Sequence, residues 1–336
     1  MSGIEKKNVG HKASAAVASL SVLLILLLVV FFTQTNFDRN SYLASCVEKH
    51  RLLESTASPR VILVGGSNLA TGLDSKLLED RLKRKVVNMG TCIQVGLGYM
   101  LREIASQARE GDTIAIMPEY EHWVDQFDGS KYLLMLPSLI PESISWIAPS
   151  YLSAKTLVSR ISGDFPSMAQ KRARHLLPFS FKSIDPDENS LLYKHTGFNQ
   201  RGDFVAHLDL PGKSFDSAQP SLADFSHPNR SAIRTFNSIV RGMQARGAKI
   251  VYLPPVTTAT FSRIRKSQLD SFYKEISAAL NAQVIDDYSR YALSDEYFLD
   301  CIYHVRKEGR RIRTELVAAD LNRILEADSP SLGSNL

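Results

Sequence analysis

The chain has 336 residues, of which 44% are hydrophobic and 22% charged, and its formal net charge is +5 at pH 7. These proportions are those of a globular protein with a full core and exclude bulk disorder. The charge is small and partly local, because Lys6, Lys7 and Lys12 lie together near the N-terminus. The chain lacks the basic stripe of a nucleic-acid-binding protein, so we expect no nucleic-acid partner.

The first predicted element is a membrane-spanning helix over residues 13–34. Residues 13–32 carry no charge, and about 20 apolar residues cross the roughly 30 Å hydrocarbon core of a bilayer. The preceding lysines place residues 1–12 in the cytoplasm. The alternative is a cleaved signal peptide, but its apolar core is usually about 7–15 residues long and ends at a cleavage site with small residues. Here the polar stretch TQTNFDRN follows instead, so we expect an uncleaved anchor.

After a connector over residues 35–58, which contains the helical stretch SCVEKHRLLES, short apolar strands alternate with amphipathic helices. Such an alternation predicts a three-layer α/β/α domain over residues 59–327, with a mostly parallel five-stranded sheet. A last helix runs to residue 327, and the polar residues 328–336 are expected to be disordered. The five predicted strands lie in the stretches RVILVGG, KVVNMG, DTIAIMPEY, KIVYLPP and AQVIDD.

The alternation stops between about residues 124 and 229. This stretch predicts a partly helical insertion, with a basic run, QKRARH, at residues 170–175. Two interpretations stay open at this point. The insertion lies over the active edge and shapes a substrate cleft, or it is a packed decoration without a function of its own.

The turn GGSN, residues 65–68, decides the class of site. A phosphate-binding loop needs G-x-x-x-x-G-K-[ST], and no lysine follows here at that spacing. A dinucleotide-binding turn needs G-x-G-x-x-G and an acidic residue at the end of the second strand, which here ends in Asn88. We therefore expect no nucleotide cofactor. The remaining interpretations are a nucleophilic Ser67 and a Ser67 that only caps the following helix.

A nucleophilic serine needs a histidine to take its proton and a carboxylate to orient that histidine. The stretch YFLDCIYHVRKEGRR supplies Asp300 and His304 just before the last helix. Because active sites of open parallel sheets form at the carboxyl ends of the strands, Ser67, Gly90 and Glu119 are expected at one edge of the sheet.

Together, GGSN, VNMG and DCIYHVRKEG resemble the SGNH/GDSL hydrolase superfamily, over about residues 59–125 and 230–325. More narrowly, they resemble its membrane-anchored bacterial branch, which includes alginate acetylation proteins and the D-alanine transfer protein of teichoic acids. The resemblance implies a flavodoxin-like fold and a location at the bacterial inner membrane, with the domain in the periplasm or outside the cell. It also implies action on acyl esters of cell-envelope polysaccharides, in some members beside a membrane-bound O-acyltransferase.

The resemblance implies that Ser67 is the nucleophile, His304 the general base and Asp300 its orienting carboxylate. The backbone N–H groups of Ser67 and Gly90 would form the oxyanion hole. The histidine and aspartate of the superfamily are usually three residues apart, and here they are four apart, which leaves Asp295 as an alternative acid.

A second departure concerns the third oxyanion donor. Glu119 stands near the place of the usual asparagine, and an ionised carboxylate only accepts hydrogen bonds. Either the third donor is missing or Asn68 or His122 supplies it. Glu119 and His122 are also predicted as contacts for substrate, with Glu119 holding a sugar hydroxyl or a basic side chain, and a structural role for Glu119 is the alternative.

The three cysteines are too few and too scattered for a metal site. Cys92 follows Gly90 and Cys301 adjoins Asp300, so we predict a disulfide between the two catalytic loops that leaves Cys46 free. The sequence thus predicts an extracytoplasmic serine esterase or O-acyltransferase that acts on a cell-envelope glycan, without cofactor or metal. The alternative is a non-catalytic accessory protein that binds glycan or docks a membrane-bound O-acyltransferase.

Overall fold

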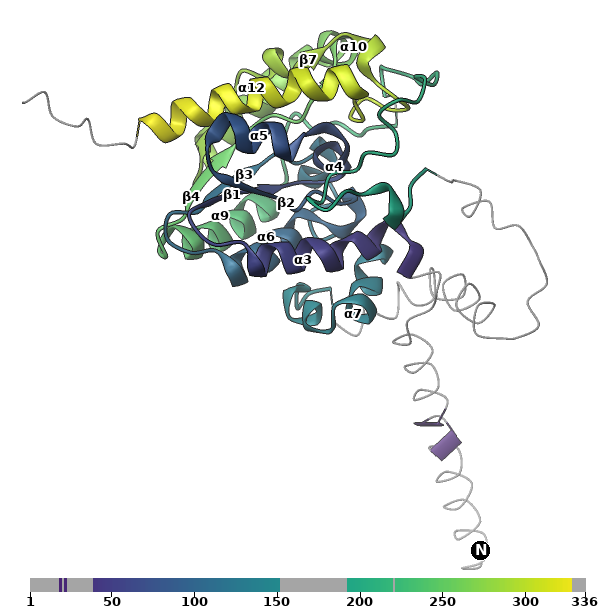
Figure 1. The fold of residues 1–336 in the computed structure, drawn as a ribbon, viewed down its shortest axis with the longest axis vertical. Coiled ribbons are helices and arrows are strands. Elements are labelled where there is room, and N and C mark those ends of the chain that lie inside the picture. The colour runs from purple at the N-terminus through teal and green to yellow at the C-terminus, as the bar shows by residue number, and fades with distance from the viewer. Residues whose placement is uncertain (1–17, 20, 23–38, 152–191, 220, 328–336) are drawn as a thin grey trace, which may run out of the picture.

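A computed structural model describes residues 18–19, 21–22, 39–151, 192–219 and 221–327 (Figure 1). Its centre is a five-stranded sheet in which every neighbouring pair is parallel, in the order β2-β1-β3-β4-β6. The five strands expected from the apolar runs, and their parallel direction, are confirmed. They are β1 (Arg60–Val64), β2 (Lys85–Asn88), β3 (Thr113–Ile116), β4 (Lys249–Tyr252) and β6 (Gln283–Val284).

The predicted site lies at the edge formed by the carboxyl ends of the strands, here called the site edge, and the strand order places it between β1 and β3. The chain runs from β1 to β2 on one side and then crosses back to β3 on the other, which makes the gap between β1 and β3 a topological switch point. In open parallel sheets, ligands bind beyond the carboxyl ends of the strands at such a point. The register pairs Val64 with Ile116, so β1 and β3 end level with each other.

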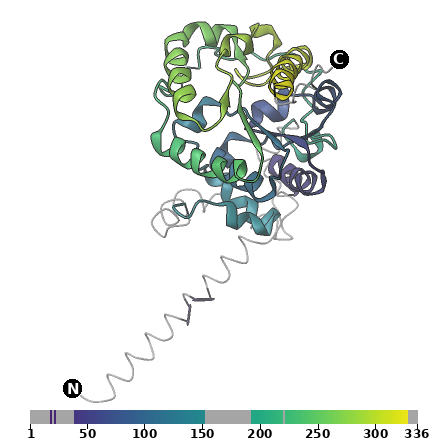
Figure 2. The ribbon, with the colours of Figure 1, turned by 90° about the vertical axis from the view of Figure 1, so that its left-hand side faces the viewer.

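Helices cover both faces of the sheet, as Figures 1 and 2 show from two sides. Ile62 and Val64 of β1 point into one apolar cluster, and Val61 and Leu63 point into the other. All four are fully buried, because a parallel strand between two helical layers meets no solvent on either face. One cluster contains residues of α3 (Ser45–Ser55), α6 (Leu97–Gln107), α9 (Arg230–Gln244) and α11 (Lys266–Ala279); the other contains residues of α4 (Ser67–Gly72), α5 (Ser75–Leu82) and α12 (Lys307–Glu326).

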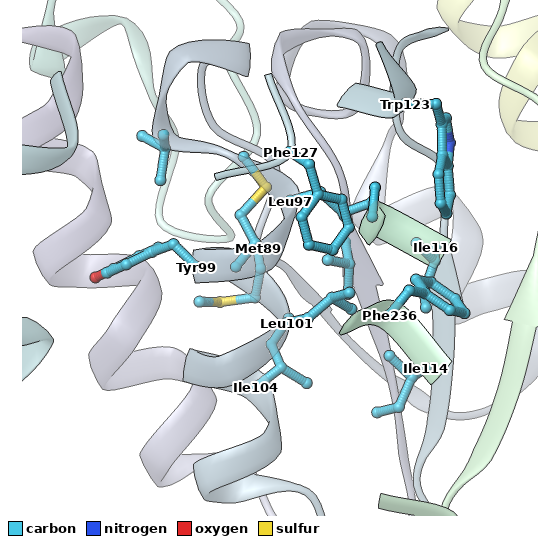
Figure 3. Packing of buried hydrophobic residues seen from close by; sticks show 14 of the residues in the cluster. Met89, Leu97, Tyr99, Leu101, Ile104, Ile114, Ile116, Trp123, Phe127 and Phe236 are labelled. Carbon is cyan, nitrogen blue, oxygen red and sulfur yellow. The ribbon is translucent and has the colours of Figure 1, made fainter. Parts of the chain in front are cut away.

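The larger cluster also anchors the segment that follows β3 (Figure 3). Trp123 and Phe127 pack there with Phe236 of α9, and the Trp123 indole N–H donates to the Tyr252 hydroxyl at 3.2 Å. Because these rings are buried, the loop between β3 and Trp123 starts and ends in the core. Its polar side chains are therefore held in place beside the site edge.

The smaller elements lie around this core. A two-stranded parallel sheet joins β5 (Thr257–Thr258) to β7 (Ala292–Leu293). Two further short helices are α7 (Leu136–Leu139) and α10 (Ala259–Ile264). The 3₁₀ turns are η1 (Tyr42–Ala44), η2 (Ile93–Val95), η3 (Tyr120–Trp123), η4 (Lys131–Met135), η5 (Pro141–Trp146), η6 (His195–Gly197), η7 (Tyr288–Tyr291) and η8 (Asp295–Tyr297).

The predicted connector contains a helix, and that helix belongs to the globular unit. In α3, Leu53 is fully buried, and the Lys49 ammonium donates at 2.9 Å to the Asn88 carbonyl at the end of β2. The same ammonium bonds the Gly202 carbonyl, which belongs to the insertion. The packed unit therefore begins before residue 59, because α3 covers part of one sheet face.

Several predictions fall on residues that the structure leaves undescribed. Most of the predicted anchor 13–34, the basic run 170–175 and the tail 328–336 lie outside the described residues. Within the described part of the chain, no helix has both the length and the apolar character to cross a bilayer. The described parts of the insertion hold only α7 and 3₁₀ turns, and residues 192–204 of it lie against the site edge.

Candidate active site

Ser67, His304 and Asp300 meet at the edge of the sheet. The Ser67 Oγ lies 2.9 Å from the His304 Nε2, although 237 positions separate the two residues. On the other side of the ring, the His304 Nδ1 lies 2.8 Å from the Asp300 Oδ1. The side chains of His304 and Asp300 are 15% and 21% exposed, so both are partly open to solvent. This is the hydrogen-bond order that lets an imidazole take a proton from a serine while a carboxylate holds the ring.

A closed loop brings Asp300 and His304 together. The Leu299 N–H donates to the His304 carbonyl at 2.8 Å, and Phe298 and Val305 form an antiparallel bridge. These contacts fold residues 298–305 back on themselves, so a spacing of four residues suffices to join the two side chains. Asp295, the predicted alternative acid, is not placed for that role, because its Oδ1 accepts from the Thr260 N–H at 3.1 Å.

The turn that carries Ser67 is held by Glu119 from the loop after β3. The Gly66 N–H donates to the Glu119 Oε2 at 3.0 Å, and the Asn68 N–H donates to Oε1 at 2.9 Å. A Cβ on Gly66 would overlap the Glu119 carboxylate, so this position needs glycine. Glu119 is 1% exposed. The prediction that it contacts substrate is therefore wrong, and its role here is to hold the turn.

Arg313 of α12 holds the same turn from the opposite side. Its guanidinium is fully buried and donates to both the main-chain carbonyl and the side-chain Oδ1 of Asn68. Burial lowers the pKa of Arg313 to about 10, which leaves it charged at neutral pH. The Asn68 Nδ2 donates to the Met117 carbonyl at 2.9 Å. The prediction of Asn68 as an oxyanion donor is therefore wrong, because Asn68 is fully buried and its backbone N–H already donates to Glu119.

The backbone N–H of Gly90, the second predicted oxyanion donor, also has an acceptor already. Its N–H donates to the Asn88 Oδ1 at 2.9 Å, and the Asn88 Nδ2 donates at 2.9 Å to the buried carboxylate of Asp203. A Cβ on Gly90 would overlap the backbone of Ala70, so glycine serves close packing at this position. Of the predicted donors, only the Ser67 N–H has no acceptor among the described residues.

His122 does not reach the site surface. Its side chain is fully buried, and its Nδ1 lies 3.5 Å from the Glu119 Oε2. Burial lowers the pKa of His122, so the ring is neutral at physiological pH. The prediction that His122 contacts substrate or donates to an oxyanion is wrong.

The alternative role for Ser67 as a helix cap is also absent, since no side-chain cap bond starts α4.

Tyr193 completes the site, and sequence reasoning missed it. Its hydroxyl donates to the Asp300 Oδ2 at 2.6 Å and lies 3.1 Å from the His304 Nδ1. Its ring stacks on Phe204, with 5.5 Å between the ring centroids. The two oxygens of Asp300 thus have separate partners, which fixes the carboxylate. No motif surrounds Tyr193 in the sequence, so only the tertiary structure reveals this contact.

The surroundings of His304 favour its charged form. Burial opposes protonation, but the neighbouring Cys301 and Asp300 favour it, and the pKa of His304 rises to about 10. Burial likewise tends to raise the pKa of Asp300, and the bonds from His304 and Tyr193 lower it overall. The site therefore stabilises the imidazolium that forms when the ring takes a proton. The neutral ring, which accepts that proton, gains population as the pH rises.

The predicted disulfide between Cys92 and Cys301 is wrong, because Cys46, Cys92 and Cys301 are all free thiols. Burial raises the pKa of Cys92 and that of Cys46 to about 12, so both keep their protons. Cys301 lies instead beside Asp300 and His304, and the side-chain ligand atoms of these three residues all lie within 4.8 Å of one another.

Glu121 supports the loop of His304 and makes stability depend on pH. Its Oε2 accepts from the Tyr303 hydroxyl at 2.9 Å, and burial raises the pKa of Glu121 from 4.5 to about 7. Between these values the folded protein holds a proton that the unfolded chain releases, so the free energy of unfolding falls as the pH rises through this window. In Glu121→Gln we expect a smaller fall, measured by urea unfolding at several pH values. An unchanged slope in the variant would assign the pH dependence to other groups.

Neither the protein-family models nor the curated proteins include a match to this chain. Among solved structures, the crystal structure of the protein YxiM from Bacillus subtilis is similar, with a TM-score of 0.35 and 12% sequence identity. The similarity covers 81% of this chain and 58% of that one, so this chain spans less than two thirds of that protein. A similarity at this TM-score does not indicate a function.

Proposed function

We propose that this protein is a serine-dependent esterase or O-acyltransferase that forms an acyl-enzyme at Ser67. The observation that carries the proposal is the hydrogen-bonded series from the Ser67 Oγ through His304 to Asp300. We further propose that its substrate is an acylated glycan of the bacterial cell envelope and that the domain works outside the cytoplasm, with a membrane-bound O-acyltransferase as a partner. Substrate, partner and location rest on the sequence resemblance and on the apolar stretch 13–34.

The proposed mechanism gives each residue one step. As the Ser67 Oγ attacks the ester carbonyl, the His304 Nε2 takes its proton, and Asp300 stabilises the resulting imidazolium. The oxyanion of the tetrahedral intermediate faces the Ser67 N–H. His304 then gives the proton to the departing alcohol, which leaves the acyl group on Ser67. In the second half, His304 takes a proton from water or from a sugar hydroxyl, which attacks the acyl-serine.

Whether water or a sugar accepts the acyl group depends on access to the site. Transfer requires that water be excluded while the acyl-enzyme waits for its acceptor. Tyr193 brings residues of the insertion against His304 and Asp300. We propose that residues 192–204 of the insertion control this access, which is the cleft-shaping interpretation of its sequence.

One observation favours the alternative, a non-catalytic accessory protein. Gly90 and Asn68 donate to other groups, so the site retains one of its predicted oxyanion donors. Loss of a single such donor from an enzyme costs about 10²–10³ in kcat. A Ser67→Ala variant that fully restores function in cells lacking the wild-type protein would favour the accessory role.

Labelling with a fluorophosphonate tests the enzyme proposal directly. The Ser67 Oγ attacks phosphorus and fluoride leaves, so only an activated serine reacts. We expect one label per chain, on the peptide that contains Ser67, with no label in Ser67→Ala and strongly slowed labelling in His304→Ala. A matched control is Ser145→Ala, which removes an exposed serine hydroxyl whose hydrogen-bond partner among the described residues is the Glu142 carbonyl, and which should leave labelling unchanged. Labelling that persists in Ser67→Ala would contradict the proposal.

A further inference from the structure

The loop that carries His304 also brings together three different metal-ligating side chains. The carboxylate of Asp300, the thiol of Cys301 and the imidazole of His304 offer ligand atoms within 4.8 Å of one another. All three side chains are half-buried. Thiolate, imidazole and carboxylate are the ligands that Zn²⁺ uses in proteins. The sequence expectation against a metal site weighed the cysteines only with one another, whereas this cluster needs a single thiol.

We propose that Asp300, Cys301 and His304 bind a zinc-type divalent cation and that its binding switches the serine site off. Zinc lies about 2.0–2.3 Å from such ligands, so its ligand atoms must come within roughly 4 Å of one another. The Nδ1 and Oδ1 atoms of His304 and Asp300 are already 2.8 Å apart. The hydrogen bond between Leu299 and His304 closes the loop, and the thiol of Cys301 lies within 4.8 Å of both other ligand atoms.

The ion would take the place of the proton between His304 and Asp300. A metal on Nδ1 needs the lone pair of that nitrogen, so the charged ring releases its Nδ1 proton to solvent and keeps the proton on Nε2, and the Cys301 thiol also releases its proton. The ring then donates to the Ser67 Oγ and has no lone pair left to accept the serine proton. Without that base, the hydroxyl is a weak nucleophile. This inhibitory half of the proposal rests on the proposed function, whereas the binding half does not.

The neighbours of the cluster act in opposite directions. The Tyr193 hydroxyl donates to the Asp300 Oδ2, the carboxylate oxygen that the ion does not need, and it keeps the carboxylate oriented as outer hydrogen bonds do in metal sites. The positive charge of the Lys213 ammonium interacts with the Asp300 carboxylate and would repel a metal cation bound there. We therefore expect reversible binding that a chelator removes, in keeping with a regulatory site.

Cobalt titration of the full chain tests the binding half without reference to activity. We expect one Co²⁺ per chain with a thiolate-to-metal charge-transfer absorption, which an equivalent of Zn²⁺ abolishes. Cys301→Ser should lose this absorption and weaken Zn²⁺ binding at least tenfold, with Cys301→Ala as a second variant and circular dichroism to verify folding. Cys92→Ser is the matched control, since Cys92 is also a free, half-buried thiol. It should keep the absorption, and so should Ser67→Ala.

Fluorophosphonate labelling then tests the inhibitory half. Zn²⁺ should stop labelling of Ser67 in the wild type, and a chelator should restore it. In Cys301→Ser, the ratio of labelling with and without Zn²⁺ should stay near one at the same concentration. If the wild type showed no charge-transfer absorption with Co²⁺, the proposed metal site would be wrong. It would also be wrong if the absorption persisted in both Cys301 variants. If the ion bound but left labelling of Ser67 unchanged, the proposed inhibition would be wrong. If the wild type bound Co²⁺ through Cys301 but was never labelled, only the proposed function would be wrong.

Discussion

Replacing Ser67 with Ala is expected to lower kcat/KM for a chromogenic acyl ester by at least about 10³-fold. The reason is that the Ser67 Oγ is the only hydroxyl bonded to the His304 Nε2 among the described residues, so its removal leaves the base without a nucleophile to activate. His304→Ala should cost a similar factor, because a serine without its base is unreactive. Residues that act as a unit are not additive. The double variant should therefore be hardly slower than either single variant.

The double-variant comparison makes this test specific. Initial rates of ester cleavage for the wild type, both single variants and the double variant separate a shared mechanism from two independent effects. If the two losses multiplied, Ser67 and His304 would act in different steps. If Ser67→Ala retained most of the activity, the acyl-serine mechanism would fail. Ser145→Ala again serves as the control for loss of a serine hydroxyl away from the site.

Replacing Glu119 with Ala is expected to destabilise the fold by about 3–5 kcal/mol, the cost of breaking up a buried charged network. The variant leaves the N–H groups of Gly66 and Asn68 without acceptors in the interior. It also removes a negative charge that acts on the buried guanidinium of Arg313. We expect a lower urea midpoint with little change in the slope, which is the signature of a change in stability.

Two further variants separate this effect from a general loss of charge. Glu119→Gln keeps the shape, but its NH₂ group would face one of the two backbone N–H groups, so it should be destabilised as well. Glu308→Ala removes an exposed glutamate in the first turn of α12 and should change stability by no more than about 0.5 kcal/mol. A Glu119→Ala variant as stable as Glu308→Ala would contradict the role of Glu119 in holding the serine turn.

Much of the fold could be predicted because it depends on local patterns. The stretches around β1, β3 and β4 are apolar runs next to turn residues, and such runs between amphipathic helices have few alternatives to a parallel sheet. The meeting of Ser67 with His304 could also be predicted. Both follow turns at the carboxyl ends of the sheet, where the topology of parallel strands brings distant segments together.

The interpretation of Glu119, Gly90 and Asn68 could not be settled in this way. Each has the right residue type and position for a site residue, but which bonds it makes depends on partners far away in the chain. Glu119 accepts from residues 51 and 53 positions away, and Arg313 bonds Asn68 across 245 positions. No local pattern indicates such pairings, so the sequence does not show that the backbone N–H groups of Gly90 and Asn68 already have acceptors.

The sequence by itself determined the five strands, their parallel direction, the edge of the sheet where the predicted site residues lie, and the choice of Ser67, His304 and Asp300 as the side chains that meet there. Only the tertiary structure decided that Glu119 and Arg313 hold the serine turn, that Tyr193 fixes Asp300, and that Cys301 lies beside His304 instead of bridging to Cys92. The physical reason is that hydropathy and turn preference act over a few residues. A buried polar group, by contrast, must find a hydrogen-bond partner wherever in the chain the packed interior places one.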